Sequence, residues 1–176
     1  MRSKSCGTSA RRSAARRTEA MRLKLIAAGT RLPAWIEAGY QEYARRLTAE
    51  APIELIEVAV PRGTAQGARE RATQKEGERM LEAIPKSAWV VALDVTGRAI
   101  DTPALSRWWA TRQRDGRDVV FLIGGPDGLA APVLERADER MSLSALTFPH
   151  GLVRILLAEQ LYRAVSLLKG HPYHRE

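Results

Sequence analysis

Segments with the apolar pattern of strands alternate along this chain with segments that have the spacing of helices. Two segments, residues 89–95 and 119–123, are almost wholly apolar, as expected of central strands that are covered on both faces. Shorter apolar or alternating runs predict three more strands, at 21–28, 53–60 and 141–146. Helical spacing and capping residues predict helices over 33–47, 68–84, 102–113, 129–138 and 151–168. This order predicts one α/β domain with a Rossmann-like, largely parallel sheet.

Ligands of such sheets bind where the strands end at their carboxyl edge. Three segments follow predicted strands and are therefore expected on one rim: 93–95, 124–128 and 144–150. The rim is the predicted position of a binding site.

The last predicted helix, 151–168, carries apolar residues on all sides. A helix of this kind is buried all round. The sequence therefore favours a homodimer interface on this helix. Coverage by another segment of the same chain is the alternative.

Charge is concentrated at the start of the chain. The whole chain carries a formal charge of +8, yet residues 1–20 hold six basic residues and one acidic one. The remainder is only mildly basic, which permits nucleic-acid binding without requiring it. A single cysteine, Cys6, excludes an intramolecular disulfide framework and a cysteine-rich zinc site. No apolar run is long enough to span a membrane.

Residues 1–20 are small, polar and basic, and they cannot bury enough apolar surface to offset the entropy of ordering. We expect a disordered basic extension, followed by the domain at 21–176. The favoured interpretation is a dispensable or mis-assigned extension with Met21 as the functional start. An RNA-contacting arm and an organellar targeting peptide are the alternatives.

Two segments on the predicted rim could contact a ligand through their backbone. Gly124, Gly125 and Gly128 allow close approach of a ligand, although a Pro-Asp-Gly sequence is also an ordinary turn. Residues 142–150 bring small and hydroxyl side chains to a helix N-terminus, where backbone N–H groups are free to bond a ligand. A serine-capped helix start is the simpler interpretation of the second segment.

Two further features carry charge or titratable groups. Arg154 lies close to an apolar stripe of its helix and needs an anion or acceptor nearby. Its partner could be Glu159 or Asp94, or else an RNA phosphate or a cofactor carboxylate. The terminal sequence HPYHRE contains two of the three histidines of the chain, which is a weak metal signal, and we expect no metal.

Three segments together resemble one known family: LIGGPDGL at 122–129, MSLSALTFPHGLVRILLAEQLYRA at 141–164 and HPYHRE at 171–176. They are similar to the RlmH group of SPOUT methyltransferases, and the resemblance extends over residues 21–176. It implies methylation of N3 of a pseudouridine in 23S rRNA with S-adenosylmethionine as methyl donor. It also implies a C-terminal trefoil knot, a homodimer, and the cytoplasm as compartment.

The resemblance also assigns site residues. The positions that match the cofactor site of the family are Leu93, Gly125, Ser144, Ala145, Leu146, Thr147, Phe148 and Pro149. A group near neutral pKa must accept the N3 proton, and His171 or His174 is the expected acceptor. Arg154, Tyr173 and Arg175 are expected to position the phosphate and the base, with the tail completing the site of a dimer partner.

Other functions remain open at the level of sequence. The same family could act on another RNA position or on tRNA, and a non-catalytic ribosome-binding module would fit the basic charge. A nicotinamide-dependent enzyme is disfavoured because the chain lacks the GxGxxG fingerprint. The small charge of residues 21–176 predicts recognition of a large, shaped substrate, with the large ribosomal subunit or the 70S ribosome as partner.

Overall fold

The computed structural model describes residues 21–48, 51–59 and 66–175, and the side chains of 66, 174 and 175 are not described. Five strands form one sheet in the order β2-β1-β4-β3-β5, and every neighbouring pair is parallel. The strands are β1 (Leu23–Ala28), β2 (Ile53–Val58), β3 (Trp89–Ala99), β4 (Val119–Ile123) and β5 (Glu139–Ser142). The predicted α/β fold with a parallel sheet is confirmed. The proposed extension at 1–20 lies outside the described residues.

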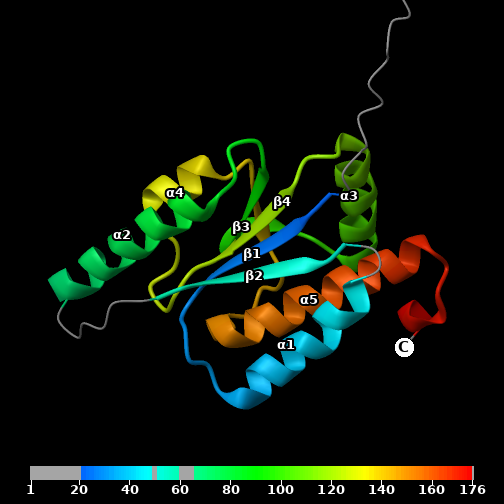
Figure 1. Cartoon of the computed structure of the whole chain (residues 1–176), viewed down its shortest axis with the longest axis horizontal. Coiled ribbons are helices and arrows are strands. Elements are labelled where there is room, and N and C mark those ends of the chain that lie inside the picture. The colour runs from blue at the N-terminus through cyan, green and yellow to red at the C-terminus, as the bar shows by residue number, and fades with distance from the viewer. Residues whose placement is uncertain (1–20, 49–50, 60–65, 176) are drawn as a thin grey trace, which may run out of the picture.

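Helices cover both faces of this sheet (Figure 1). Their bounds are α1 (Ala34–Leu47), α2 (Gln66–Ala83), α3 (Thr102–Asp115), α4 (Ala131–Arg136) and α5 (His150–Leu168), and a 3₁₀ turn η1 (Pro172–Arg175) follows. Side chains that alternate along β1 and β4 divide the core into two clusters. Leu25 and Phe121 face the cluster under α1, α3 and α5, whereas Ile26 and Leu122 face the cluster under α2 and α4. This alternation explains why β4 is apolar throughout and why β1 is apolar from Leu25 onward.

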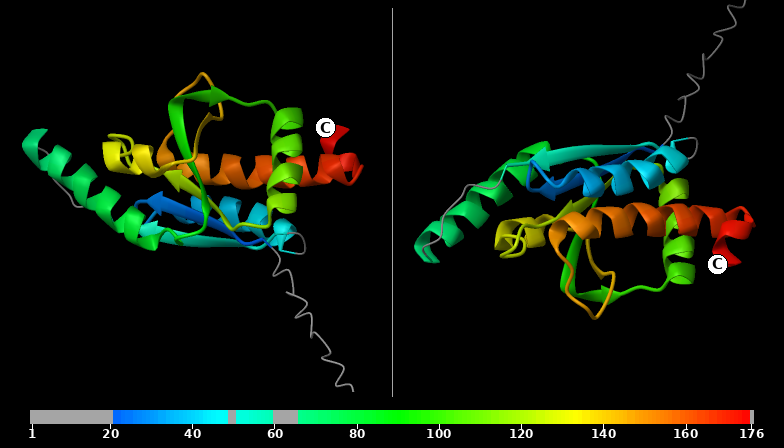
Figure 2. Two further views of the ribbon diagram at one scale, coloured as in Figure 1. Left: turned by 90° about the horizontal axis from the view of Figure 1, so that it is seen from above. Right: turned by 90° about the horizontal axis from the view of Figure 1, so that it is seen from below.

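Two strands differ from the predicted ranges. β3 continues past residue 95 to Ala99, and its register against β5 shifts between Leu93 and Arg98. β5 begins and ends earlier than predicted, and the chain after Ser142 becomes a loop. The irregular register bends the end of β3 away from the sheet, so this end and the following loop of β5 project together (Figure 2).

Helix α5 lies between α1 and α3 on one face of the sheet (Figure 2). Leu157, Leu161 and Val165 on its inner side are buried. Leu152, Val153 and Leu156 stay half-exposed. Neighbouring elements of the same chain therefore cover only part of this apolar helix.

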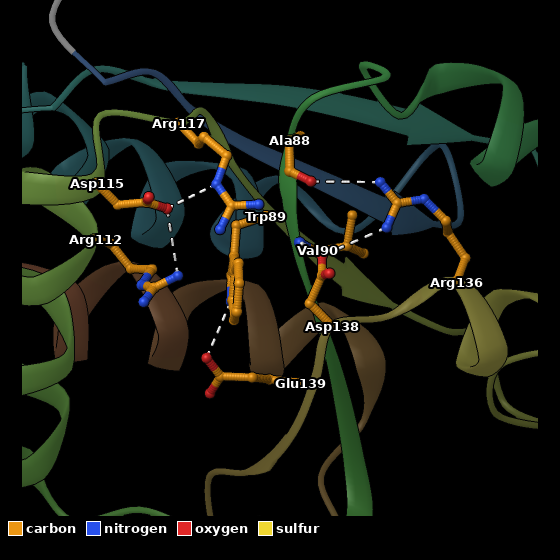
Figure 3. Close-up of polar contacts among 9 residues, drawn as sticks. All are labelled: Ala88, Trp89, Val90, Arg112, Asp115, Arg117, Arg136, Asp138 and Glu139. Carbon is orange, nitrogen blue, oxygen red and sulfur yellow. Dashed lines mark hydrogen bonds and ion pairs between the residues drawn. The ribbon is translucent and has the colours of Figure 1, made fainter.

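A cluster of side chains surrounds Trp89, the first residue of β3, at the end of the sheet opposite to the end of β3 (Figure 3). The guanidinium groups of Arg112 and Arg117 lie over the Trp89 ring, 4.0 Å and 4.7 Å from its centroid. Glu139 accepts hydrogen bonds from the indole nitrogens of Trp89, at 3.0 Å, and Trp108, at 2.9 Å. One carboxylate thereby ties the start of β5 to β3 and α3, which sets where the loop after β5 begins.

Candidate active site

A cavity of about 670 Å³ opens at the carboxyl edge of β3, β4 and β5. Its walls are the end of β3, the turn after β4, and the loop between β5 and α5. These are the three segments that the sequence places on one rim. The lining residues are Leu93, Asp94, Val95, Ile123, Gly124, Gly125, Pro126, Gly128, Leu129, Met141, Ser142, Leu143, Ser144, Leu146, Thr147, Phe148, Pro149, His150 and Val153.

The turn after β4 closes tightly on itself. The Gly128 N–H donates to the Gly125 carbonyl at 3.0 Å, and the two residues form a single antiparallel bridge. Gly128 has φ +80°, a left-handed conformation that glycine adopts without strain. The turn therefore presents backbone rather than side chains to the cavity along this wall.

The loop after β5 is held by its own hydroxyl groups. The Ser142 hydroxyl donates to the Ser144 carbonyl at 2.8 Å, and the Ser144 hydroxyl accepts from the Leu146 N–H at 2.9 Å. The Leu146 side chain nevertheless remains 69% exposed, and Val95 across the cavity is 65% exposed. Exposed apolar side chains at the mouth of a cavity are typical of a surface that a ligand or partner covers.

His150 begins α5 and contributes an imidazole to the cavity wall. Burial, with the charge of Arg154 as a smaller cause, lowers the pKa of His150 below its usual value. This imidazole is therefore neutral at pH 7 and can accept a proton. The sequence placed His150 in the rim segment 144–150, but it did not give His150 a catalytic or cofactor-binding role.

Arg154 lies one turn further along α5 and is buried, with 1% of its surface exposed. Its guanidinium donates to the carbonyls of Ala28, at 2.8 Å, and Gly29, at 2.6 Å, and it pairs with Glu57 at 2.5 Å. The partner carboxylate is therefore Glu57 on β2, and neither Glu159 nor Asp94 takes this role. Arg154 joins α5 to the ends of β1 and β2.

The tail lies at the other end of α5. This helix has 19 residues and is about 28 Å long at 1.5 Å per residue. His150 at its start lines the cavity, whereas η1 follows its end (Figure 2). The tail residues of one chain therefore do not reach the cavity of the same chain.

Aromatic and acidic neighbours hold Tyr173 against α5. Its ring lies 4.7 Å from the ring of Tyr162 in an edge-on arrangement, and its hydroxyl donates to Glu159 at 3.3 Å. Burial, a hydrogen bond with Tyr43 and the charge of Glu159 raise the pKa of Tyr173 to about 12. Tyr173 is therefore a neutral hydrogen-bonding group at pH 7. His171, next to it, is exposed.

Comparison with known proteins places this geometry in a family. The family model described as Predicted SPOUT methyltransferase matches residues 21–174. The chain belongs to the SPOUT methyltransferase family.

Three similar curated proteins carry the name Ribosomal RNA large subunit methyltransferase H. The protein of Alkalilimnicola ehrlichii is 55% identical over 155 residues, which cover 88% of this chain and 99% of the relative. The protein of Thioalkalivibrio sulfidiphilus is 53% identical over 156 residues, covering 89% of this chain and all of the relative. The protein of Hahella chejuensis is 47% identical with the same coverage.

A SPOUT methyltransferase needs a place for a methyl donor, and the cavity has the size and surface of a small-molecule site. All residues that the sequence analysis assigned to the cofactor line it, except Ala145, which lies in the same loop. Asp94 and Val95 were expected on the rim without a role at the cofactor, whereas Val153 was not expected there, because nothing in its local sequence separates it from ordinary helix residues. The sequence pattern also missed Glu76, a buried residue of α2 whose carboxylate bonds to Gly125.

Neither a metal-ligand cluster nor a membrane-spanning helix is found among the described residues. Within 21–48, 51–59 and 66–175, no three His, Cys, Asp or Glu side chains gather as metal ligands. In the same part of the chain, no helix is both long and apolar enough to cross a membrane.

Proposed function

We propose that this SPOUT methyltransferase transfers a methyl group from S-adenosylmethionine to N3 of a pseudouridine in 23S rRNA on the assembled ribosome. The observation that carries the proposal is the cavity at the carboxyl edge of the sheet, where the predicted cofactor residues meet. The relatives named Ribosomal RNA large subunit methyltransferase H support the choice of rRNA as substrate.

Backbone groups and apolar side chains are proposed to hold the donor. Gly125 offers close backbone approach on one wall, and the segment 144–149 offers backbone groups on the other. Leu93 and Leu146 supply apolar surface for a nucleoside between these walls. When bound, the donor supplies a methyl group on a positively charged sulfur, so the chain mainly needs to align it with the attacking nitrogen.

The nitrogen must lose its proton as the N–C bond forms and the S–C bond breaks. We propose that His171 or His174 of a second copy accepts this proton, with Tyr173 and Arg175 beside it positioning the base and phosphate. His150 is the alternative acceptor, because its neutral imidazole already lines the cavity. Arg154 is proposed to hold the start of α5, where His150 lines the cavity, against β1 and β2.

We propose that the protein acts as a homodimer and that its compartment is the cytoplasm. The half-exposed apolar side of α5 supports a dimer, and the length of α5 requires that any tail acting at a cavity comes from another copy. We further propose that residues 21–176 form the catalytic domain, with the knot that is typical of the family in its C-terminal part.

Mass spectrometry of 23S rRNA tests the function. We expect a strain that lacks the gene to lose one methyl group from one pseudouridine. Expression of residues 21–176 should restore it, and a chain with Gly124→Ala should not. A methyl group that persists in the deletion strain, or that is lost from tRNA instead, would contradict the proposal.

A further inference from the structure

Glu76, on α2, is a buried carboxylate directly behind the turn that lines the cavity. It is 3% exposed, and its Oε1 accepts a hydrogen bond from the Gly125 N–H at 3.1 Å. A Cβ atom on Gly125 would lie 3.0 Å from Oε2 of the same carboxylate. The carboxylate therefore occupies the space beside Gly125, which itself lines the cavity.

No basic side chain compensates this carboxylate in the described part of the chain. The charged group acting on it is Asp127, a second acid, from the turn that leads to α4. On the other sides Ala28 of β1 lies beside Gly125, and Ala130 and Val133 pack against Gly77, so these neighbours are apolar. Burial and Asp127 raise the pKa of Glu76, against the lowering by the Gly125 N–H.

An ionised carboxylate without a counter-ion is unfavourable inside a protein. A hydrogen bond to one glycine could be made by a neutral glutamine at lower cost. Burial and Asp127 therefore favour the protonated form of Glu76, and a positive charge in the cavity on the far side of Gly125 would favour its ionised form. The proposed donor carries such a charge on its sulfur, whereas its demethylated product is a neutral thioether.

We infer that Glu76 is a positioning residue with two roles: it holds Gly125 in the cavity wall, and its charge makes the cavity prefer the sulfonium donor over the thioether product. The inference rests on the proposed use of S-adenosylmethionine. Methyl transfer removes the positive charge from sulfur, so the attraction by Glu76 ends with the reaction. Product release is then favoured without any movement of the chain.

Calorimetric titration with S-adenosylmethionine and with S-adenosylhomocysteine tests this inference. Glu76→Gln keeps an oxygen that can accept the Gly125 hydrogen bond and removes the charge. We expect this variant to bind S-adenosylmethionine about tenfold more weakly, corresponding to about 1.4 kcal/mol, and the product within about twofold of wild type. Glu78→Gln, an exposed change of the same kind on the same helix, should alter neither affinity.

Glu76→Asp separates the two roles, because it keeps the charge and withdraws the carboxylate from Gly125. Both ligands should bind it more weakly, with part of the preference for the sulfonium retained. Equal weakening of both ligands by Glu76→Gln, or no weakening of either, would overturn the charge role. Failure of wild-type protein to bind either ligand would instead overturn the proposed function.

A pH titration tests the inference without any change at Glu76. His150 also lines the cavity and becomes cationic in acid, so the measurement uses His150→Gln. Asp127 then remains as the other acid facing Glu76. The double variant His150→Gln/Asp127→Asn is therefore measured beside His150→Gln. The preference for sulfonium over thioether, measured from pH 8 to pH 5, should fall towards acid in both variants, because acid protonates Glu76 and its raised pKa favours this. A constant preference over this range would overturn the inference.

Discussion

The turn after β4 leaves no room for a side chain at Gly124. A Cβ atom there would lie 2.6 Å from the carbonyl carbon and oxygen of Gly128, and neither backbone atom can move away without opening the turn. We expect Gly124→Ala to cost roughly 2 kcal/mol in the free energy of unfolding, as overpacked sites do, and to abolish donor binding. Urea denaturation and calorimetry measure the two effects.

Gly67, in the first turn of α2, is the matched control. A Cβ atom there meets nothing within 4 Å. Gly67→Ala should leave donor binding unchanged and stabilise the protein by up to about 1 kcal/mol, as alanine does in helices. Equal effects of Gly124→Ala and Gly67→Ala on donor binding would contradict the proposed role of the turn after β4 in holding the donor.

Arg154 offers a second prediction at the scale of single residues. Arg154→Met leaves Glu57 and two carbonyls without their donor and should lower the free energy of unfolding by about 3 kcal/mol. Glu57→Gln should cost only about 1 kcal/mol, because the Glu57 side chain is 34% exposed and water screens its charge. Urea denaturation of both variants measures these losses. A larger loss in the free energy of unfolding for Glu57→Gln than for Arg154→Met would contradict the prediction.

Some residues of the site could be predicted from the sequence, and some of their contacts could not. Gly125 and the segment 144–149 were predictable through the family resemblance, because their residue types alone also fit an ordinary turn and a serine-capped helix start. The pairing of Arg154 with Glu57 was not, because the two residues are 97 positions apart and only the sheet order brings them together. The same holds for Glu76 and Gly125, which are 49 positions apart.

At the scale of elements, α5 separates two parts of the proposed site. Its start lines the cavity, and the tail after its end carries the proposed proton acceptors. We expect deletion of residues 171–176 to reduce methyl transfer at least about a hundredfold, the range of general-base catalysis. Donor affinity should stay within about threefold, because the tail does not contact the cavity of its own chain. Transfer assays on ribosomes and calorimetry measure these effects.

Mixing two inactive chains provides the control for this deletion. A tail-deleted chain has an intact cavity, and a Gly124→Ala chain has an intact tail. Their mixture should regain part of the activity if the tail acts on the cavity of a partner. Full activity of the tail-deleted chain alone would exclude the tail as proton acceptor and leave His150 in that role.

Strands and helices were predictable in type and order, because β1, β4 and the first half of β3 are apolar on both faces. The ends of β3 and β5 were not. Residues 96–99 of β3 include Thr96, Gly97 and Arg98, and nothing in this polar stretch indicates a strand. It is ordered by pairing with β5 after a change of register, so the pairing is a tertiary effect.

At the scale of the whole molecule, the small excess of basic over acidic residues in 21–176 limits how the protein can find its substrate. Weak charge gives weak affinity for RNA in general, so shape must select the site. We expect methyl transfer on assembled ribosomes to be at least about a hundredfold faster than on naked 23S rRNA fragments. Equal rates on both, in initial-velocity assays at one salt concentration, would contradict this expectation.

The structure of a crystal soaked with S-adenosylmethionine tests the central claim most directly. The account predicts density for the donor between Gly125 and the segment 144–149, against Leu93. A second cavity, lined by Arg69, Thr73, Asp127 and Pro132 between α2 and α4, provides the comparison. Donor density in that second cavity, or none in the first at saturating concentration, would contradict the account.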